Sequence, residues 1–278
     1  MTAAAPRPVV DPALLNGAPA ATQWANLGYW PARSYPEAAA GLARRVGRAV
    51  GLQADDVVLD VGCGHGDSLM LWVREVGVRR AVGVEPDAAV VAATNARLRA
   101  AGVQGRAEAV QGRAEAVQGR AEVVQARAEA PSILAPSAVL CVDAAYHFDT
   151  RQSWLTDLAR TVPPGTLLGL ADLLVTRRAL RGTAVRRFAA RAGIPEANLW
   201  TAHDVEPLLA DCGWRIDRMV RCGPEVLGGF ARFAARSAAR LALAPRRGGW
   251  RALGTAATIA ALGVGTRVDY AIIAAQRT

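Results

Sequence analysis

The stretch that decides the fold is "VVLDVGCGHG", residues 57 to 66. Its apolar, β-branched first half is typical of a buried strand. The three glycines that follow allow a sharp turn in which backbone amides approach a ligand. A dinucleotide-binding loop has its third glycine three positions after the second, where this chain has Asp67. The spacing therefore disfavours NAD binding, and a second acid, Glu85, closes the next expected strand.

Strand and helix patterns alternate outward from this stretch. Ser34 and Glu37 form a capping box that predicts a helix to about Val50, while Asp87 and Thr150 predict the starts of two later helices. Alternation of this kind predicts a parallel sheet covered on both faces, within one domain of 278 residues. Besides the third strand discussed next, we expect strands at 57–62, 81–85, 138–143, 166–172, 214–222 and 267–276.

A repeat interrupts the alternation at residues 105–125, "GRAEAVQGRAEAVQGRAEVVQ". Each seven-residue copy contains a glycine and offers only alanine and valine as apolar residues, so a coiled-coil seam is disfavoured against a duplicated surface stretch. Any copy could supply the third strand. We expect the last, "AEVVQAR", because it leaves the shortest link to the strand at 138–143.

Composition excludes several classes of chemistry. The formal charge is +9, but every basic residue is an arginine, so coding bias weakens the charge as evidence for nucleic-acid binding. Without lysine, neither a Schiff base nor a P-loop can form. The four cysteines are widely spaced, which argues against a zinc site or a disulfide framework, and we expect no metal. No signal-peptide pattern or membrane-length apolar run occurs, so the expected location is the cytoplasm.

Four ordered motifs give the chain a resemblance to class I S-adenosylmethionine-dependent methyltransferases. Within them it resembles the group of ubiquinone, tocopherol and sterol methyltransferases. The segment "NLGYW" (26–30) is similar to the N-terminal segment that folds over the cofactor in such enzymes. The motifs are "VLDVGCGHG" (58–66), "GVEPD" (83–87), "DAAYHF" (143–148) and "RTVPPGTLLGLAD" (160–172).

The resemblance implies a Rossmann-like α/β fold with a seven-stranded, mostly parallel sheet whose last strand is antiparallel. It also implies an N-terminal helical cap over the cofactor at residues 1–50, and a helical lid. The lid corresponds to two arginine-rich excursions at 173–200 and 224–262. In the second, Phe230, Phe233 and Leu241 are expected on one side of a helix, with Arg232, Arg236 and Arg240 on another.

The same resemblance implies a set of residues that bind S-adenosylmethionine. Asp60 and Asp143 would face its methionine part, and Glu85 would accept hydrogen bonds from both ribose hydroxyls. After the third strand, where the family has an aspartate for the adenine amino group, the alignment puts Arg127 beside Ala128. Arginine cannot accept that bond, so backbone or Glu129 is expected to take this role. The full expected set is Tyr29, Asp60, Gly62, Cys63, Gly64, Glu85, Pro86, Arg127, Ala128 and Asp143.

"AYHF", residues 145–148, follows a strand at the edge where parallel sheets place ligands. His147 is the expected general base, with a purely structural role as the alternative, and Tyr146 is the second candidate catalytic residue. Tyr146 and Phe148 also suit the wall of an acceptor pocket. Cys63, His65 and His203 are expected to be structural or loop residues.

Two other functions compete with methyl transfer to an apolar or aromatic small molecule. "DAAY" superficially resembles the Asp-Pro-Pro-Tyr motif of nucleic-acid amino methyltransferases, but both prolines are missing and the arginines form no aromatic-interleaved patch. The other is a non-catalytic protein that binds S-adenosylmethionine. A weak association of the arginine-striped helix with membrane surfaces is also left open.

Overall fold

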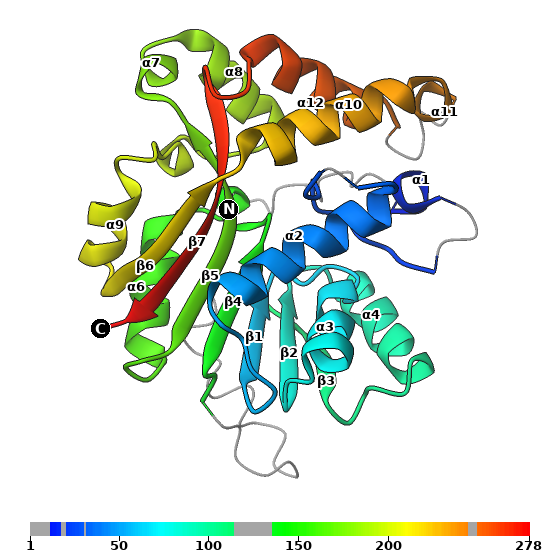
Figure 1. Ribbon diagram of the computed structural model, residues 1–278, viewed down its shortest axis with the longest axis vertical. Coiled ribbons are helices and arrows are strands. Elements are labelled where there is room, and N and C mark those ends of the chain that lie inside the picture. Colours follow the sequence, from blue (N-terminus) through cyan, green and yellow to red (C-terminus); the bar gives the residue numbers. More distant parts are fainter. Residues whose placement is uncertain (1–11, 18–20, 31, 114–134, 244–248) are drawn as a thin grey trace.

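The computed structural model describes residues 12–17, 21–30, 32–113, 135–243 and 249–278, and contains one seven-stranded sheet (Figure 1). The strand order is β3-β2-β1-β4-β5-β7-β6. Only β7 runs antiparallel to its neighbours, so the predicted mostly parallel sheet with an antiparallel last strand is confirmed. The strands are β1 Val57–Val61, β2 Arg80–Glu85, β3 Ala107–Gln111, β4 Ala138–Val142, β5 Leu167–Val175, β6 Trp214–Arg221 and β7 Val268–Arg277.

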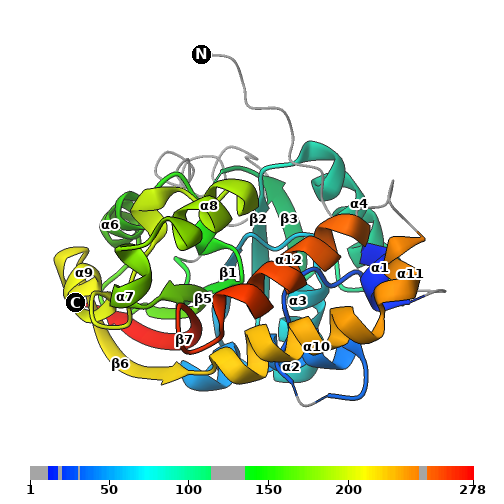
Figure 2. The ribbon, with the colours of Figure 1, turned by 90° about the horizontal axis from the view of Figure 1, so that it is seen from above.

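Helices cover both faces of this sheet, as the alternation predicted. Figure 2 shows α2 and α6 on opposite sides. One apolar core contains side chains of α2, α3 and α4, and the other contains side chains of α6 and α9. These helices are α2 Tyr35–Ala49, α3 Asp67–Leu71, continued by the π-helical turn η1 Trp72–Val76, α4 Ala88–Ala100, α6 Arg151–Thr161 and α9 Val205–Asp211.

The predicted helix starts are confirmed by side chains that accept backbone N–H bonds. Ser34 Oγ accepts from Glu37 N before α2, and Asp87 Oδ1 accepts from Ala89 N before α4. Thr150 caps α6 in the same way through Ser153 N, at 2.9 Å. Each cap satisfies an amide that the first helical turn leaves without an internal partner.

The third strand comes from the first copy of the repeat, so the prediction that the last copy supplies it is wrong. β3 pairs with β2 from Ala107 to Gln111, and Asn95 of α4 fixes it through two hydrogen bonds to the backbone of Ala109. Six residues join α4 to β3. Connections in α/β units are usually short, and here the short connection is the one between α4 and β3. The prediction had instead assumed a short connection between β3 and β4. Residues 114–134, with the predicted strand, lie outside the described residues.

Two helical excursions lie in the connections around β6. The first follows β5, which extends to Val175, so its first three predicted residues belong to a strand. The first excursion contains α7 Arg177–Leu180, α8 Thr183–Ala192 and the 3-10 turn η4 Glu196–Asn198. The second contains the π-helical turn η5 Pro224–Gly228, α10 Gly229–Arg236, α11 Ala238–Ala242 and α12 Gly249–Leu262. None of the described helices is both long and apolar enough to span a bilayer.

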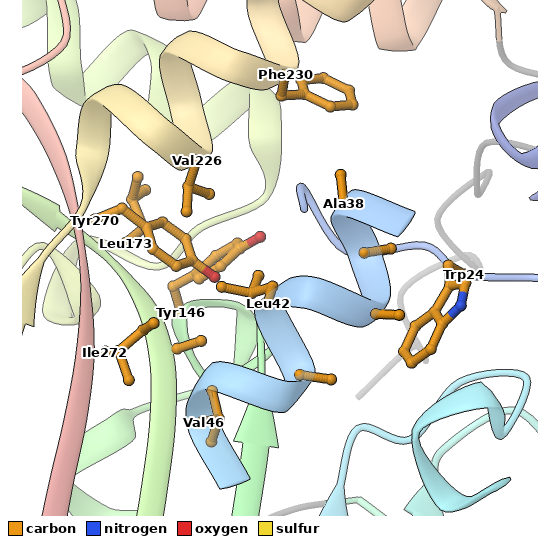
Figure 3. Close-up of a cluster of buried hydrophobic side chains, with 14 of the residues drawn as sticks. Trp24, Ala38, Leu42, Val46, Tyr146, Leu173, Val226, Phe230, Tyr270 and Ile272 are labelled. Carbon is orange, nitrogen blue, oxygen red and sulfur yellow. The ribbon is translucent and has the colours of Figure 1, made fainter. Parts of the chain in front are cut away.

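The predicted sidedness of α10 is confirmed for its described side chains. Phe230 is buried and Phe233 packs against the core, whereas Arg232 and Arg236 are exposed. Leu241 in α11 is buried as well. Figure 3 shows Phe230 facing the N-terminal part of α2.

The second excursion packs on the N-terminal segment that precedes α2. The Phe233 ring stacks on both Trp30 and Tyr35, with ring centroids 5.3 Å apart in each pair. Trp30 N donates to Glu225 O at 3.0 Å. Gly229 makes the approach close, because a Cβ there would lie 2.1 Å from the Trp30 ring. The two segments therefore form one continuous cover over the pocket edge of the sheet.

Deleting residues 105–118 should leave fold and activity nearly intact, because the remaining copy "GRAEVVQ" then follows the turn after α4 and supplies the edge strand. It places valine where buried Ala109 stands, which should cost about 1–3 kcal/mol of unfolding free energy. Thermal melting measures this cost. Deleting residues 112–118 alone keeps the "AEAVQ" strand and is the control. A large drop in the melting temperature of the 105–118 deletion, with the control unaffected, would show that the copies are not interchangeable.

Candidate active site

A pocket of about 110 Å³ opens at the carboxyl ends of β1 and β4. These neighbouring strands are the point where the order of the sheet reverses, which is where doubly wound folds bind ligands. The lining comes from the N-terminal segment, the glycine loop, the start of α3 and the end of β4. It comprises Gln23, Trp24, Ala25, Asn26, Asp60, Gly62, Cys63, Gly64, His65, Asp67, Ser68, Val142 and Asp143.

The glycine loop takes a path that requires a glycine at its first position. Gly62 has φ +81°, and a Cβ on it would lie 2.6 Å from the Ala144 Cβ after β4. The amides of Gly62 and Cys63 donate to Val84 O of β2, at 2.9 and 3.2 Å. The loop is thus held between the neighbouring strands, which leaves its outer edge as part of the pocket wall.

Asp60 lies at the floor of the pocket and is only 1% exposed. Trp72 Nε1 donates to its Oδ2 at 2.8 Å. Burial raises the pKa of Asp60 to about 6, although hydrogen bonds from Ser68 and Trp72 act in the opposite direction. A positive ligand group beside this carboxylate would lower its pKa again.

Glu85, the last residue of β2, lies beside the glycine loop. Its carboxylate accepts from Gly64 N at 3.2 Å and from Asp87 N at 3.3 Å. Burial raises the pKa of Glu85, and these two amide bonds partly offset that rise. Oε2 therefore faces the glycine loop, while Oε1 faces the start of α4.

Asp143 accepts hydrogen bonds from three separate segments. Tyr270 and Tyr146 donate to its Oδ1, at 2.7 and 2.9 Å, and Leu27 N donates to its Oδ2 at 2.7 Å. Figure 3 shows the hydroxyl groups of Tyr146 and Tyr270 converging near Leu42. Burial raises the pKa of Asp143 to about 7 despite these donors. Asp143 is also the one described residue other than glycine with a left-handed backbone, at φ 63°.

A strap, residues 23–27, crosses the pocket between two carboxylates. Leu27 N is held by Asp143, and Gln23 N donates to Asp67 Oδ2 at 3.0 Å. Arg97 fixes Asp67 through two hydrogen bonds of 2.9 Å. The strap residues between these ends line the pocket.

Sequence reasoning missed Asp67, Arg97 and Tyr270. Asp67 gives a signal, because an acid directly after a glycine loop at a helix start is suited to bind backbone or ligand donors. Tyr270 gives none, since an apolar strand pattern contains no information about which strand end faces Asp143.

Half of the ten expected cofactor residues meet at this pocket. Asp60, Gly62, Cys63, Gly64 and Asp143 line it. Glu85 borders the glycine loop, and the exposed Pro86 follows it. Arg127, Ala128 and Glu129 lie outside the described residues.

Three expected side chains do not line the pocket. Tyr29 lies under the Arg45 guanidinium, whose Cζ is 3.7 Å from the ring centroid. The Tyr146 and His147 rings pack together with centroids 4.4 Å apart, and Tyr146 reaches the pocket only through Asp143. His147 Nδ1 lies 3.4 Å from Gly193 O, at the end of α8.

The chemistry of the lining fits a ligand with positive charge. Three of its side chains are carboxylates, and Arg97 neutralises only Asp67. The two remaining carboxylates, Asp60 and Asp143, have raised pKa values that a nearby cation would lower. S-Adenosylmethionine, with its sulfonium and ammonium groups, matches this requirement.

Comparison with known proteins finds a match that covers most strands of the sheet. A family model described as a methyltransferase domain matches residues 33–218. The O-methyltransferase resE of Aspergillus sclerotiorum is 27% identical over 201 residues, which cover 69% of this chain and 68% of that protein.

Two solved structures show the same fold at low identity. Geranyl diphosphate C-methyltransferase from Streptomyces coelicolor A3(2) superposes with a TM-score of 0.71 at 15% identity, over 98% of this chain and 100% of the other. The cyclopropane synthase MmaA2 from Mycobacterium tuberculosis has a TM-score of 0.72 at 17% identity, over 95% and 92% of the two chains.

The raised pKa values predict that the ligand-free protein loses stability as pH rises. The unfolded chain releases the protons of Asp60 and Asp143 near pH 4, whereas the folded chain retains them until about pH 6 and about pH 7. Their stabilising contribution is therefore complete below about pH 4 and is lost progressively up to about pH 7.

Melting temperatures between about pH 5 and about pH 8 test this, with Asp143→Asn as the variant and exposed Asp55→Asn as the control. The slope against pH should flatten in Asp143→Asn and stay unchanged in Asp55→Asn. Equal slopes in both variants would show that Asp143 titrates normally in the folded protein.

Proposed function

We propose that this chain, which belongs to the methyltransferase-domain family and is an S-adenosylmethionine-dependent methyltransferase, acts on an apolar or aromatic small molecule. One observation supports this acceptor class most directly. The cover beside the pocket is built from aromatic and aliphatic side chains of residues 23–30, α2 and the second excursion, including Trp24, Trp30, Tyr35, Val226, Phe230 and Phe233. These side chains are buried or packed against the core, so an acceptor that entered between these segments would meet mainly apolar groups, which favours an apolar acceptor over a charged one.

On the cofactor side, each proposed role follows from the chemistry of the residue. Asp60 and Asp143 offer negative charge to the ammonium and sulfonium groups, and the loop from Gly62 to Gly64 lies along the methionine part. Each carboxylate oxygen of Glu85 accepts one backbone N–H, from Gly64 or Asp87, and can accept a second hydrogen bond. The two oxygens would therefore accept from the two ribose hydroxyls. Pro86 would border the ribose. Tyr29 would act indirectly, by supporting the segment that follows the strap.

S-Adenosylmethionine supplies an activated methyl group, so the protein needs mainly to align the acceptor with it. Residues 23–27 contribute by covering the pocket and limiting access of water. If the acceptor carries a proton, a base is also needed.

His147 is the proposed base, and Gly193 would set its tautomer. A backbone carbonyl only accepts, so the 3.4 Å contact with Gly193 O supports the tautomer that has its proton on Nδ1 and its lone pair on Nε2. Nε2 is then the ring atom able to take a proton from a hydroxyl acceptor. Tyr146 donates to Asp143, which makes it a positioning residue and pocket wall in this proposal.

The acceptor class can be tested with the methyl-labelled cofactor and a panel of phenols, terpenoid alcohols and lipids, followed by mass spectrometry. We expect label in one of these organic-soluble classes. Transfer to RNA or DNA, with none to the small molecules, would instead support the nucleic-acid alternative.

Glu85→Ala should weaken S-adenosylmethionine binding by about 1.5–3 kcal/mol, because it removes charge-assisted acceptors for the ribose. Isothermal titration calorimetry measures the change. Glu75→Ala, which removes a surface acid paired with Arg44, is the matched control and should bind normally. Unchanged affinity in a folded Glu85→Ala variant would exclude the ribose role.

For a hydroxyl acceptor, His147→Ala should lower turnover by about 10² to 10⁴ with cofactor affinity retained, and the loss should shrink at high pH as the acceptor ionises by itself. Tyr146→Phe should cost less, because Tyr270 still donates to Asp143. The exposed His203→Ala serves as the control. Full turnover in His147→Ala would remove the base role.

A further inference from the structure

The charged side chains of the second excursion are all positive over most of its length, and the reaction does not explain this. Between residues 226 and 268 the sequence contains seven arginines and no aspartate, glutamate or lysine. Arg232 and Arg236 are exposed on α10. A segment of this length with no acid among its arginines is complementary to an anionic surface.

Two large apolar side chains lie exposed at the same end of this excursion. Leu243 directly follows α11 and is 86% exposed, and Trp250 is the second residue of α12 and is 61% exposed. α11 and α12 pack against each other, and Figures 1 and 2 show α11 at the outer end of the excursion, away from the sheet. Among the described residues, the one other large hydrophobic side chain exposed to solvent is Val220 on β6, at 39%.

Leu243 and Trp250 are not needed to attach the excursion to the protein. The helices are already anchored by a different set of apolar side chains, which are buried: Phe230, Leu241, Ala252, Ile259 and Leu262. The two exposed side chains therefore add apolar area to an excursion that also exposes Arg232 and Arg236. Apolar and cationic side chains exposed on one short excursion are typical of a binding surface.

We propose that this end of the excursion, defined by Leu243, Trp250 and the arginines of α10, docks on an anionic phospholipid bilayer. Tryptophan and leucine suit insertion at the boundary between head groups and acyl chains. Arginine pairs with lipid phosphates while its alkyl stem covers apolar surface.

A bilayer fits this surface better than nucleic acid does. Residues 226–268 contain no asparagine, glutamine or histidine, so besides arginine they offer few side chains able to recognise base edges. Aromatic stacking platforms also need several rings, and Trp250 is the one large aromatic side chain among the exposed described residues.

The surface belongs to the same cover that lies beside the pocket. α10 contacts the N-terminal segment through Phe233, Trp30 and Tyr35, and that segment continues from the strap over the pocket. Docking would bring the acceptor side close to a source of apolar molecules. The proposal itself rests on charge and exposure, and holds whether or not the acceptor is a lipid.

Co-sedimentation of the full chain with vesicles tests the proposal without cofactor or acceptor. We expect binding to vesicles of phosphatidylglycerol and phosphatidylcholine, weakened by high salt, and little binding to pure phosphatidylcholine. The double variant Leu243→Ser with Trp250→Ser should weaken binding at least about tenfold. Val220→Ser is the matched control for apolar exposure and should bind like the unaltered chain.

A charge pair completes the test. Arg232→Gln with Arg236→Gln should weaken binding, whereas Arg215→Gln with Arg218→Gln on β6 should not. Melting temperatures within a few degrees of the unaltered chain establish that each variant is folded. No binding to anionic vesicles, equal binding of the Leu243/Trp250 variant, or tighter binding to RNA than to vesicles would each overturn the proposal.

Discussion

The carboxylate of Asp143 is the contact on which the pocket most depends. Its donors come from the strap (Leu27), from the turn after β4 (Tyr146) and from the last strand (Tyr270). Leu27 and Tyr270 lie 116 and 127 positions from Asp143 in the sequence, yet both contact its side chain. The backbone of Asp143 is itself left-handed. Such strain persists only when surrounding contacts fix it. The strap, β4 and β7 must consequently dock together for the pocket wall to form.

This arrangement places the carboxyl groups of Asp60 and Asp143 in the buried interior. Burial disfavours the ionised forms of Asp60 and Asp143, and their hydrogen bonds offset only part of that cost. A ligand with positive charge relieves the remainder. The same electrostatics that destabilise the free protein above neutral pH thus select a cationic cofactor, and both follow from placing acids at the carboxyl ends of β1 and β4.

The two helical excursions, which we propose to form the acceptor side, are insertions that leave the sheet unchanged. The excursions lie in the connections on either side of β6, while β5, β7 and β6 still pair in register apart from one irregularity in β6. The excursions contact segments beside the pocket at defined points, such as the approach of Gly229 to Trp30 and of Gly193 to His147. Under the proposed function, substitutions in these excursions would change acceptor binding, while the carboxylates at the ends of β1 and β4 stay in place on the sheet.

By itself the sequence determined the sheet, the helix starts and the glycine loop, because apolar periodicity, caps and glycine spacing are local signals that act over a few residues. It also placed Asp60, Gly62 and Asp143 at one edge, since the carboxyl ends of parallel strands share that edge. It could not select among three near-identical copies for β3, as all present nearly the same side chains to β2. The partners of Asp143 and Asp67, and the displacement of Tyr29 from the pocket, were decided only by tertiary structure. Those contacts join segments distant in sequence, and their geometry depends on how the strap and β7 pack on the finished sheet.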